Sequence, residues 1–295
     1  MHNKTIQATI PRILVAAFLI FIALCCVMPF VIILSSSVTD EMTIIKDGFQ
    51  VLPKNFTWTT YQLIFRYPED LLRAYGVTLT VTATGAIGGL LITSLIAYTL
   101  SRKEFMFRNP LSFYVFFTML FNGGLVPYYI LVANVYDLKG SLLALILPLM
   151  VNAWNVLIMR TFFSQVPEAL IEAARMEGAG EYRIFFTIMA PLSAPVFATI
   201  GLFLVMSYWN DWFQALLFID DRAKLPLQYL LYNILRNAME VANLSRVGGQ
   251  TINAIMPAES LKMATVVLTV APMTIVFLSI QRYFVRGITI GSLKG

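Results

Sequence analysis

The sequence predicts an all-α integral membrane protein with about six transmembrane helices. Of its 295 residues, 58% are hydrophobic and 13% are charged, whereas a soluble domain usually carries about 25% charged residues. The mean hydropathy of +0.75 agrees with this composition. A soluble fold of this size could not hide so much apolar surface from water. We therefore expect lipid to be the solvent for much of one transmembrane domain, residues 1–295.

Six stretches have the length of about 20 apolar residues that a helix needs to cross the hydrocarbon core. The predicted spans are residues 13–36, 74–100, 111–133, 141–159, 191–219 and 263–282. The first is longer than the apolar core of a signal peptide and no A-x-A site follows it, so we expect it to be retained. Polar segments separate the spans, and the longest are residues 37–73, 161–190 and 220–262.

Charge sets the expected orientation. Six spans place both termini on one side of the membrane. With both termini in the cytoplasm, the shorter inner segments hold slightly more than half of the 21 lysines and arginines. Because cytoplasmic loops are enriched in these residues, we predict cytoplasmic termini, with 161–190 inside and 220–262 outside.

The residue types present argue against disulfide, metal, nucleic-acid and nucleotide binding by this chain. Cys25 and Cys26 are neighbours in an apolar run, unsuited to a structural disulfide or a metal site. The one histidine, His2, is terminal. No basic cluster longer than Arg102-Lys103 suggests nucleic-acid binding, and no phosphate-binding G-x-x-x-x-G-K-[ST] loop is present. We therefore predict that this chain is no enzyme and binds no cofactor itself.

The spans contain a single carboxylate, Asp211. Charged groups inside membranes usually mark proton relays or ion sites, so their scarcity argues against proton coupling. A sodium-coupled secondary transporter or channel remains an alternative, because unwound backbone carbonyls can hold Na⁺. A membrane enzyme acting on lipid or glycan would need an acid–base pair, and Asp211 stands alone. If the chain moves solute uphill by other means, a separate polypeptide supplies the energy.

Small residues predict close packing and one broken helix. Gly85-x-x-x-Gly89 in the second span allows helices to approach closely. In the third span, Asn122-Gly123-Gly124 and Pro127 predict a bend. The freed backbone groups need partners at that depth, so the bend lies either beside a water-filled path or inside protein packing.

The segment 161–190 predicts a helix-turn-helix. Pro167 followed by Glu, Ala, Leu and Ala is a strong helix start with acidic residues in the first turns. Gly178 and Gly180 end this helix, and a second apolar helix follows over 181–189. The result is a rigid, protruding pair of helices to which another protein could bind.

This segment resembles the "EAA" loop of binding-protein-dependent ABC importer permeases. The resemblance rests on Glu172-Ala173-Ala174, Gly178, Ile188 and Pro191. Glu177 stands where aspartate is commoner, and Ala190 where leucine usually precedes the proline. In that family the loop is a coupling helix that docks on the ATPase subunit. The resemblance thus assigns ATPase coupling to a set of neighbouring residues: Glu172, Ala173, Ala174, Glu177, Gly178 and Ala179.

Further motifs are similar to carbohydrate-uptake permeases of the maltose-transporter class. The ending resembles the oligo- and polysaccharide branch, which includes alginate-type importers. The similar segments are residues 121–128, 152–155, 160–163, 209–213, 257–264, 282–287 and 291–295.

The resemblance implies an alternating-access importer in a bacterial cytoplasmic membrane. Its partners would be a second homologous permease subunit, two ATPases that bind ATP and Mg, an extracytoplasmic sugar-binding protein, and a saccharide.

Sugars expose flat apolar faces and many hydroxyls, so aromatic and amide side chains suit them. The candidate substrate pathway is Asn122, Asn152, Asn155, Tyr208, Trp209, Asn210, Asp211 and Trp212. The alternatives are helix packing for the asparagines and anchoring at the membrane interface for the aromatic cluster.

The outer segment 220–262 predicts an amphipathic helix. Leu227, Leu230, Leu231 and further apolar residues up to Met239 recur at helical spacing, and Pro226 suits the first turn. This helix either lies on the membrane surface or covers a partner. We expect the segment 220–262 to touch the sugar-binding protein, as a loop at this position does in related importers, and Gly248-Gly249 to allow a mobile tip. The resemblance places the ending, 291–295, near the ATPase pair.

Overall fold

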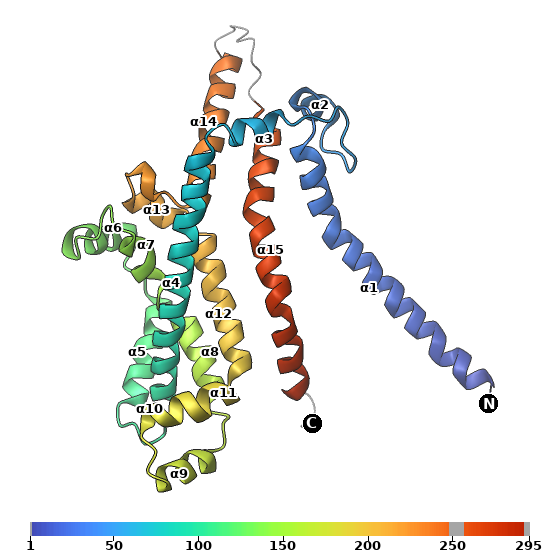
Figure 1. Cartoon of the computed structure of the whole chain (residues 1–295). Helices are drawn as coiled ribbons and strands as arrows, with labels where there is room; N and C mark the ends of the chain where they lie inside the picture. Colours follow the sequence, from blue (N-terminus) through green and yellow to red (C-terminus); the bar gives the residue numbers. More distant parts are fainter. Residues whose placement is uncertain (1, 248–256, 292–295) are drawn as a thin grey trace. The chain divides into compact units, whose positions relative to one another are not determined.

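The computed structural model describes the backbone of residues 2–247 and 257–291, and the side chains of residues 14–241 and 257–278. Gly248, Gly249 and the end of the predicted tail, 292–295, lie outside the described residues. The helices are α1 (His2–Ser37), α2 (Glu41–Asp47), α3 (Thr59–Ile64), α4 (Pro68–Ser101), α5 (Arg108–Leu120), α6 (Leu125–Ile130), α7 (Leu143–Ile146), α8 (Ala153–Phe163), α9 (Glu168–Met176), α10 (Glu181–Ile184), α11 (Ala190–Leu192), α12 (Ala194–Trp209), α13 (Phe213–Phe218), α14 (Leu227–Val247) and α15 (Ala258–Gly291) (Figure 1).

The all-α prediction is confirmed. Short π-helical segments, Leu131–Val135 and Phe185–Met189, continue α6 and α10. The β-type pairing within the described ranges is an isolated bridge between Thr39 and Phe56.

Membrane-spanning elements take two forms in the described part of the chain. Three helices are long and apolar enough to cross: Leu14–Ser37, Pro68–Ser101 and Ala258–Leu278. Three more candidates are bent pairs: Arg108–Leu120 with Leu125–Val135 at 116°, Leu143–Leu149 with Ala153–Phe163 at 47°, and Glu181–Leu192 with Ala194–Trp209 at 87°. Counting each bent pair as one span gives up to six spans. The short pieces cannot each cross alone.

The chain folds as two compact units, Met1–Pro68 with Leu231–Ala271, and Glu69–Leu230 with Pro272–Gly295. In the first unit, α1 exposes an apolar surface from Leu14 onward, as expected of a helix in lipid. The junction between α2 and α15 is polar. The buried Glu41 accepts hydrogen bonds from the backbone N–H groups of Glu259 and Ser260, both at 2.9 Å, and from Ser260 Oγ at 3.0 Å. A carboxylate thus caps the first turn of α15.

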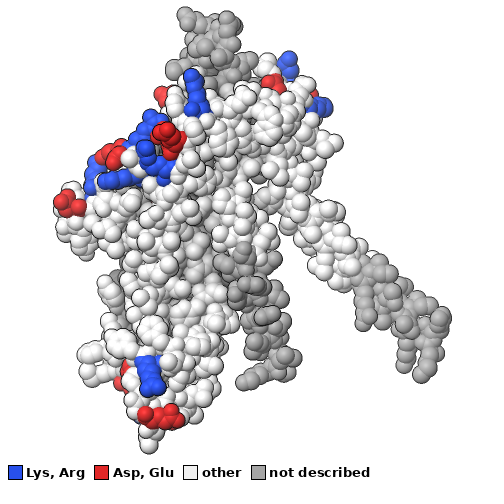
Figure 2. Space-filling model, viewed as in Figure 1, with Lys and Arg blue, Asp and Glu red and all other residues white. Residues whose placement is uncertain are grey.

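The second unit contains an extended apolar core, to which α4, α8, α9, α10 and α12 contribute. Gly85 and Gly89 of α4 allow the close approach that their spacing predicts. A Cβ at Gly85 would overlap the ring of Tyr208, and one at Gly89 would lie 2.7 Å from the carbonyl oxygen of Met150. On the face of this unit that Figure 2 shows, charged side chains gather at the end that carries α9 and near α13, and the surface between them is largely uncharged. An uncharged band of this kind suits lipid contact.

Candidate functional site

The predicted helix-turn-helix forms as α9, a tight turn and α10. Glu177 caps α9, and Gly178 follows with a φ of 80°. The N–H groups of Gly178 and Ala179 donate to the carbonyl oxygens of Arg175 and Ala174, both at 2.9 Å. A positive φ strains residues that carry a Cβ, so the turn needs glycine here. Gly180 has a φ of −76° and makes no such demand.

The helix α9 has one face in the core and one in solvent. Ile171 and Ala174 are buried in the core of the second unit. Glu172, Ala173 and Glu177 are exposed, and Met176 is 89% exposed. The predicted coupling residues therefore divide: Ala174 anchors the helix, while Glu172, Ala173 and Glu177 are available to a partner. Ala179 is half-buried in the turn.

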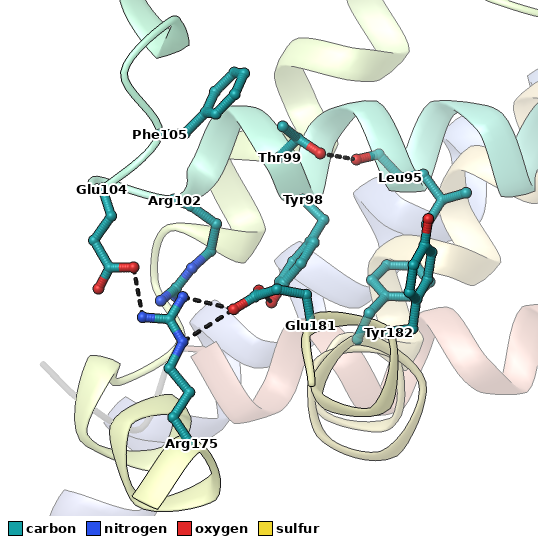
Figure 3. Close-up of a pocket in the computed structure, with 10 residues that line it drawn as sticks. Leu95, Tyr98, Thr99, Arg102, Glu104, Phe105, Arg175, Glu181 and Tyr182 are labelled. Carbon is teal, nitrogen blue, oxygen red and sulfur yellow. Dashed lines mark hydrogen bonds and ion pairs between the residues drawn. The ribbon is translucent and has the colours of Figure 1, made fainter. Parts of the chain in front are cut away.

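A charged junction ties α9 to its neighbours (Figure 3). Arg175 Nη1 donates to Glu104 at 2.5 Å, and Arg175 Nη2 and Nε donate to Glu181 at 2.7 and 3.0 Å. The hydroxyl of Tyr98 on α4 donates to the other oxygen of Glu181 at 2.6 Å. The hydrogen bonds to Glu104, and then those to Glu181, raise the pKa of the Arg175 guanidinium. One arginine of α9 thus connects the loop after α4 with the start of α10.

Sequence reasoning missed this junction. Arg175 lies inside the EAA-like segment, but its partner Glu104 is 71 residues away. The sequence offered one signal for an ion pair: Arg175 is a basic residue in a helix whose exposed charged residues are otherwise acidic. It gave no indication of which carboxylates Arg175 would meet.

The break in the third span lies where the sequence places it. The α5 helix ends at Leu120, α6 begins at Leu125, and Gly124 between them has a φ of 87°. Asn122 Oδ1 accepts from the N–H of Gly124 at 2.8 Å, and both residues are exposed in this chain. The amide of Asn122 therefore shapes the bend. Because this amide is exposed, two environments fit it: a water-filled path or the surface of a partner subunit.

The two asparagines near α8 take different positions. Asn152 is the N-cap of α8, and its Oδ1 accepts from the N–H groups of Trp154 at 2.9 Å and Asn155 at 3.4 Å. Asn155 itself is buried. Asn152 thus has a clear structural role, and substrate contact by either residue stays a prediction.

The aromatic cluster at the end of α12 also divides. Tyr208 is buried and its hydroxyl donates to the carbonyl oxygen of Ile146 at 2.7 Å, which is a packing arrangement. Trp209 is buried as well, whereas Asn210 and Trp212 are exposed and Asp211 is intermediate.

A polar chain then leads from this cluster to α6. Asp211 Oδ1 accepts from the N–H of Gln214 at 3.3 Å, and Gln214 Oε1 accepts from the hydroxyl of Tyr128 at 2.5 Å. The structure thus joins the end of α12 to the element that follows the break at Asn122.

These features define a class of protein: a multi-span membrane subunit with broken helices and a protruding helix-turn-helix. The chain belongs to the family of binding-protein-dependent transport system inner membrane components, whose model matches residues 89–290. It is thus a transport permease, as the EAA-like residues predict. The comparisons give the sodium-coupled alternative no support.

Relatives along nearly the whole chain agree with this family. The chain is 36% identical over 284 residues to the polygalacturonan/rhamnogalacturonan transport system permease protein YtcP of Bacillus subtilis, covering 96% of this chain and 97% of the relative. It is 28% identical over 297 residues to the trehalose/maltose transport system permease protein MalG of Thermococcus litoralis, covering 98% and 99%. It also resembles the crystal structure of a bacterial ABC transporter involved in the import of the acidic polysaccharide alginate. That match has a TM-score of 0.77 and 28% identity, and covers 94% of this chain and 97% of the other.

Proposed function

We propose that the chain is the permease subunit of an ATP-driven importer that moves an oligo- or polysaccharide across the cytoplasmic membrane. The saccharide class is supported by the relatives, among them the polygalacturonan/rhamnogalacturonan permease at 36% identity. Fragments of acidic polysaccharides such as polygalacturonan are therefore the first substrates to test. The assembly would comprise a second permease subunit, two ATPases with ATP and Mg, and an extracytoplasmic sugar-binding protein.

The observation that carries the proposal is the division of α9 into two faces. Ile171 and Ala174 fix one face in the core, and the opposite face, with Glu172 and Met176, is open to a partner. A helix anchored in this way moves together with the core behind it. A push by an ATPase on the exposed face would then reach α4, α8 and α12, whose side chains share that core. This arrangement suits alternating access, in which one packed body moves as a unit.

Both termini would lie in the cytoplasm, because α9 must meet a cytoplasmic ATPase. The substrate-pathway candidates lie near the break in the third span and at the end of α12: the exposed Asn122, Asn210 and Trp212, and the half-buried Asp211. Four further residues would hold the lining of that path in place by packing and helix capping: the buried Tyr208, Trp209 and Asn155, and the helix cap Asn152.

The test exploits the two glycines of the turn. At Gly178 and Gly180 a Cβ would meet nothing within 4 Å, but only Gly178 has a positive φ. Gly178→Ala should cost about 1–2 kcal/mol in local backbone strain, and Gly178→Asp adds a charge to the surface offered to the ATPase. We expect both variants to lower saccharide uptake and substrate-stimulated ATP hydrolysis. Gly180→Ala, the matched control, should leave both activities unchanged. Wild-type coupling in Gly178→Asp would overturn the proposed role of this turn.

A further inference from the structure

Arg160 begins the segment 160–163, one of those similar to carbohydrate-uptake permeases, and it has no part in the proposed coupling. It lies near the end of α8 and is half-buried. Its backbone carbonyl oxygen accepts from Ser164 Oγ at 2.9 Å, but its side chain donates no hydrogen bond to the described residues. A half-buried guanidinium has lost part of its water, which is unfavourable unless other acceptors replace it. Arg160 therefore has donor groups available for a further ligand.

A second arginine faces Arg160 from the neighbouring helix α5. In α5 the half-buried residues are Arg108, Ser112 and Val115, and the other residues of the helix are exposed. Positions i, i+4 and i+7 share one face of a helix. Because α5 packs against α8 (Figure 1), we infer that this half-buried face turns toward α8. The positive charge of Arg108 accordingly acts on the Arg160 guanidinium.

No carboxylate of the described residues forms an ion pair with either arginine of this pair. The described arginines that do form ion pairs are Arg73, Arg175 and Arg222. Arg108 Nε donates to the carbonyl oxygen of Leu100 at 3.2 Å, which engages one nitrogen but supplies no negative charge. Two like charges in a half-buried setting repel more strongly than they would in water. An anion bound to both would relieve this repulsion.

Both guanidinium groups can be reached by a ligand. Among the described residues, the sealed side-chain nitrogens that lack a hydrogen-bond partner belong to Arg102, and none belongs to Arg108 or Arg160. The nitrogens that the pair leaves unbonded are therefore accessible. The pair thus combines two positive charges, free donors and access, which are the properties that an anion site needs.

The pair lies at the membrane boundary. Arg108 is the first residue of the bent third span, and Arg160 lies three residues before the end of the bent fourth span. The ends of membrane-crossing helices are at the level of the lipid headgroups. Phe107, Leu111 and Phe162, which neighbour the two arginines along the helices, are exposed. Apolar side chains thus adjoin the charged pair.

We propose that Arg108 and Arg160 together bind the phosphate of an anionic phospholipid. The planar guanidinium matches the geometry of phosphate oxygens, and basic sites between transmembrane helices at the membrane surface suit anionic headgroups. The exposed apolar neighbours favour a ligand that carries acyl chains. A soluble phosphate shares the oxyanion chemistry but gains nothing from these neighbours. The bound lipid would tie the start of α5 to the end of α8, whichever saccharide is carried.

The experiment uses the full-length chain, co-purified with the chains that assemble with it, in phosphatidylcholine nanodiscs with or without phosphatidylglycerol. Native mass spectrometry after release counts the phosphatidylglycerol that stays bound. Arg160→Gln should weaken its retention by about tenfold, because charge-assisted hydrogen bonds to the phosphate are lost. Arg108→Gln should act in the same direction. Arg183→Gln, the matched control, removes an exposed positive charge from α10 and should retain phosphatidylglycerol like the wild type.

Three results would overturn the proposal. Equal retention by Arg160→Gln and the wild type, or an equal loss in Arg183→Gln, would show that the pair is no specific lipid site. Protection against thermal unfolding by inorganic phosphate, without lipid retention, would assign the pair to a soluble oxyanion. Loss of the ATPase from Arg160→Gln with unchanged lipid would assign Arg160 to a carboxylate of that partner.

If neither glutamine variant folds, the wild type decides. Phosphatidylglycerol should raise its unfolding midpoint above that in phosphatidylcholine alone, and equal midpoints would refute the site. Saccharide uptake is measured in none of these arms, so a refuted lipid site would leave the proposed import function standing.

Discussion

Two carboxylate junctions hold helices in this chain, and they differ in their access to water. Glu41, in the first unit, is 7% exposed and caps α15 through three hydrogen bonds. Glu104 and Glu181, in the second unit, are exposed and hold Arg175 of α9. Water competes poorly for a buried charge-assisted bond and well for an exposed one. The buried junction fixes the start of a helix, whereas the exposed junction can tether a helix that moves.

The largest effect should come from the buried junction. Glu41→Ala leaves the N–H groups of Glu259 and Ser260 without their acceptor. We expect the free energy of unfolding to fall by about 3 kcal/mol, because hydrogen bonds to a charged group are lost and buried donors remain. Thermal unfolding of the purified chain in detergent measures this loss.

Glu69→Ala is the matched control for this change. Glu69 lies in the first turn of α4 and is exposed, so its loss should shift the unfolding midpoint much less. Equal shifts for the two variants would remove the distinction between the junctions.

Arg175→Gln should have a smaller effect on stability and a larger one on coupling. Exposed ion pairs contribute about 0.2–1 kcal/mol each, so we expect a loss of about 1 kcal/mol in unfolding free energy. Without its links to Glu104 and Glu181, α9 would transmit motion less faithfully. Saccharide transported per ATP hydrolysed should therefore fall. Arg183→Gln in α10 serves as control for the loss of one positive charge. A stability loss as large as that of Glu41→Ala would contradict the conclusion that the exposed junction stabilises the fold less than the buried one.

The smallest effect should come from Glu168, which pairs with Lys103 at the start of α9. The hydrogen bond from Lys103, followed by its charge, lowers the pKa of the Glu168 carboxyl from its usual 4.5. The pair's contribution is therefore present above pH 4.5 and is lost as the pH falls through the lower, folded-state pKa. Because Glu168 is only half-buried and its partner Lys103 is exposed, we expect Glu168→Gln to change the unfolding midpoint at pH 7 by less than Arg175→Gln does. A larger shift would show that this surface pair is a main anchor of α9.

Local features of this fold could be predicted from the sequence, whereas the long-range partners at the two junctions could not. Gly178 and the break at Asn122-Gly123-Gly124 were predictable because turn and helix-breaking chemistry is local. The amphipathic α14 was predictable from its periodicity, and Leu227 at its start is buried. The partners of Glu41 and Arg175 were not predictable, because hydrogen bonds join residues 218 and 71 positions apart. Nothing in a single sequence specifies such pairs.

Tyr208 illustrates the same limit within the candidate site. Its neighbours in sequence, Trp209 to Trp212, favoured a sugar-binding cluster, but a helix end turns successive side chains in different directions. Tyr208 packs against Gly85 and bonds to Ile146, while Asn210 remains exposed. The small residue at 85 and the aromatic residue at 208 were each identifiable in the sequence, but their contact was not.

The central claim is that the exposed face of α9 meets the ATPase, and a photo-crosslinking residue at position 176 tests it most directly. Met176 is 89% exposed on α9, and Leu72, 71% exposed near the start of α4, is the control position. Both variants are irradiated in membranes that contain the complete transport system, and the crosslinked chains are identified by mass spectrometry. We predict that position 176 crosslinks to the ATPase chain and position 72 does not. Crosslinks from position 176 only to lipid or to an extracytoplasmic protein would contradict the claim.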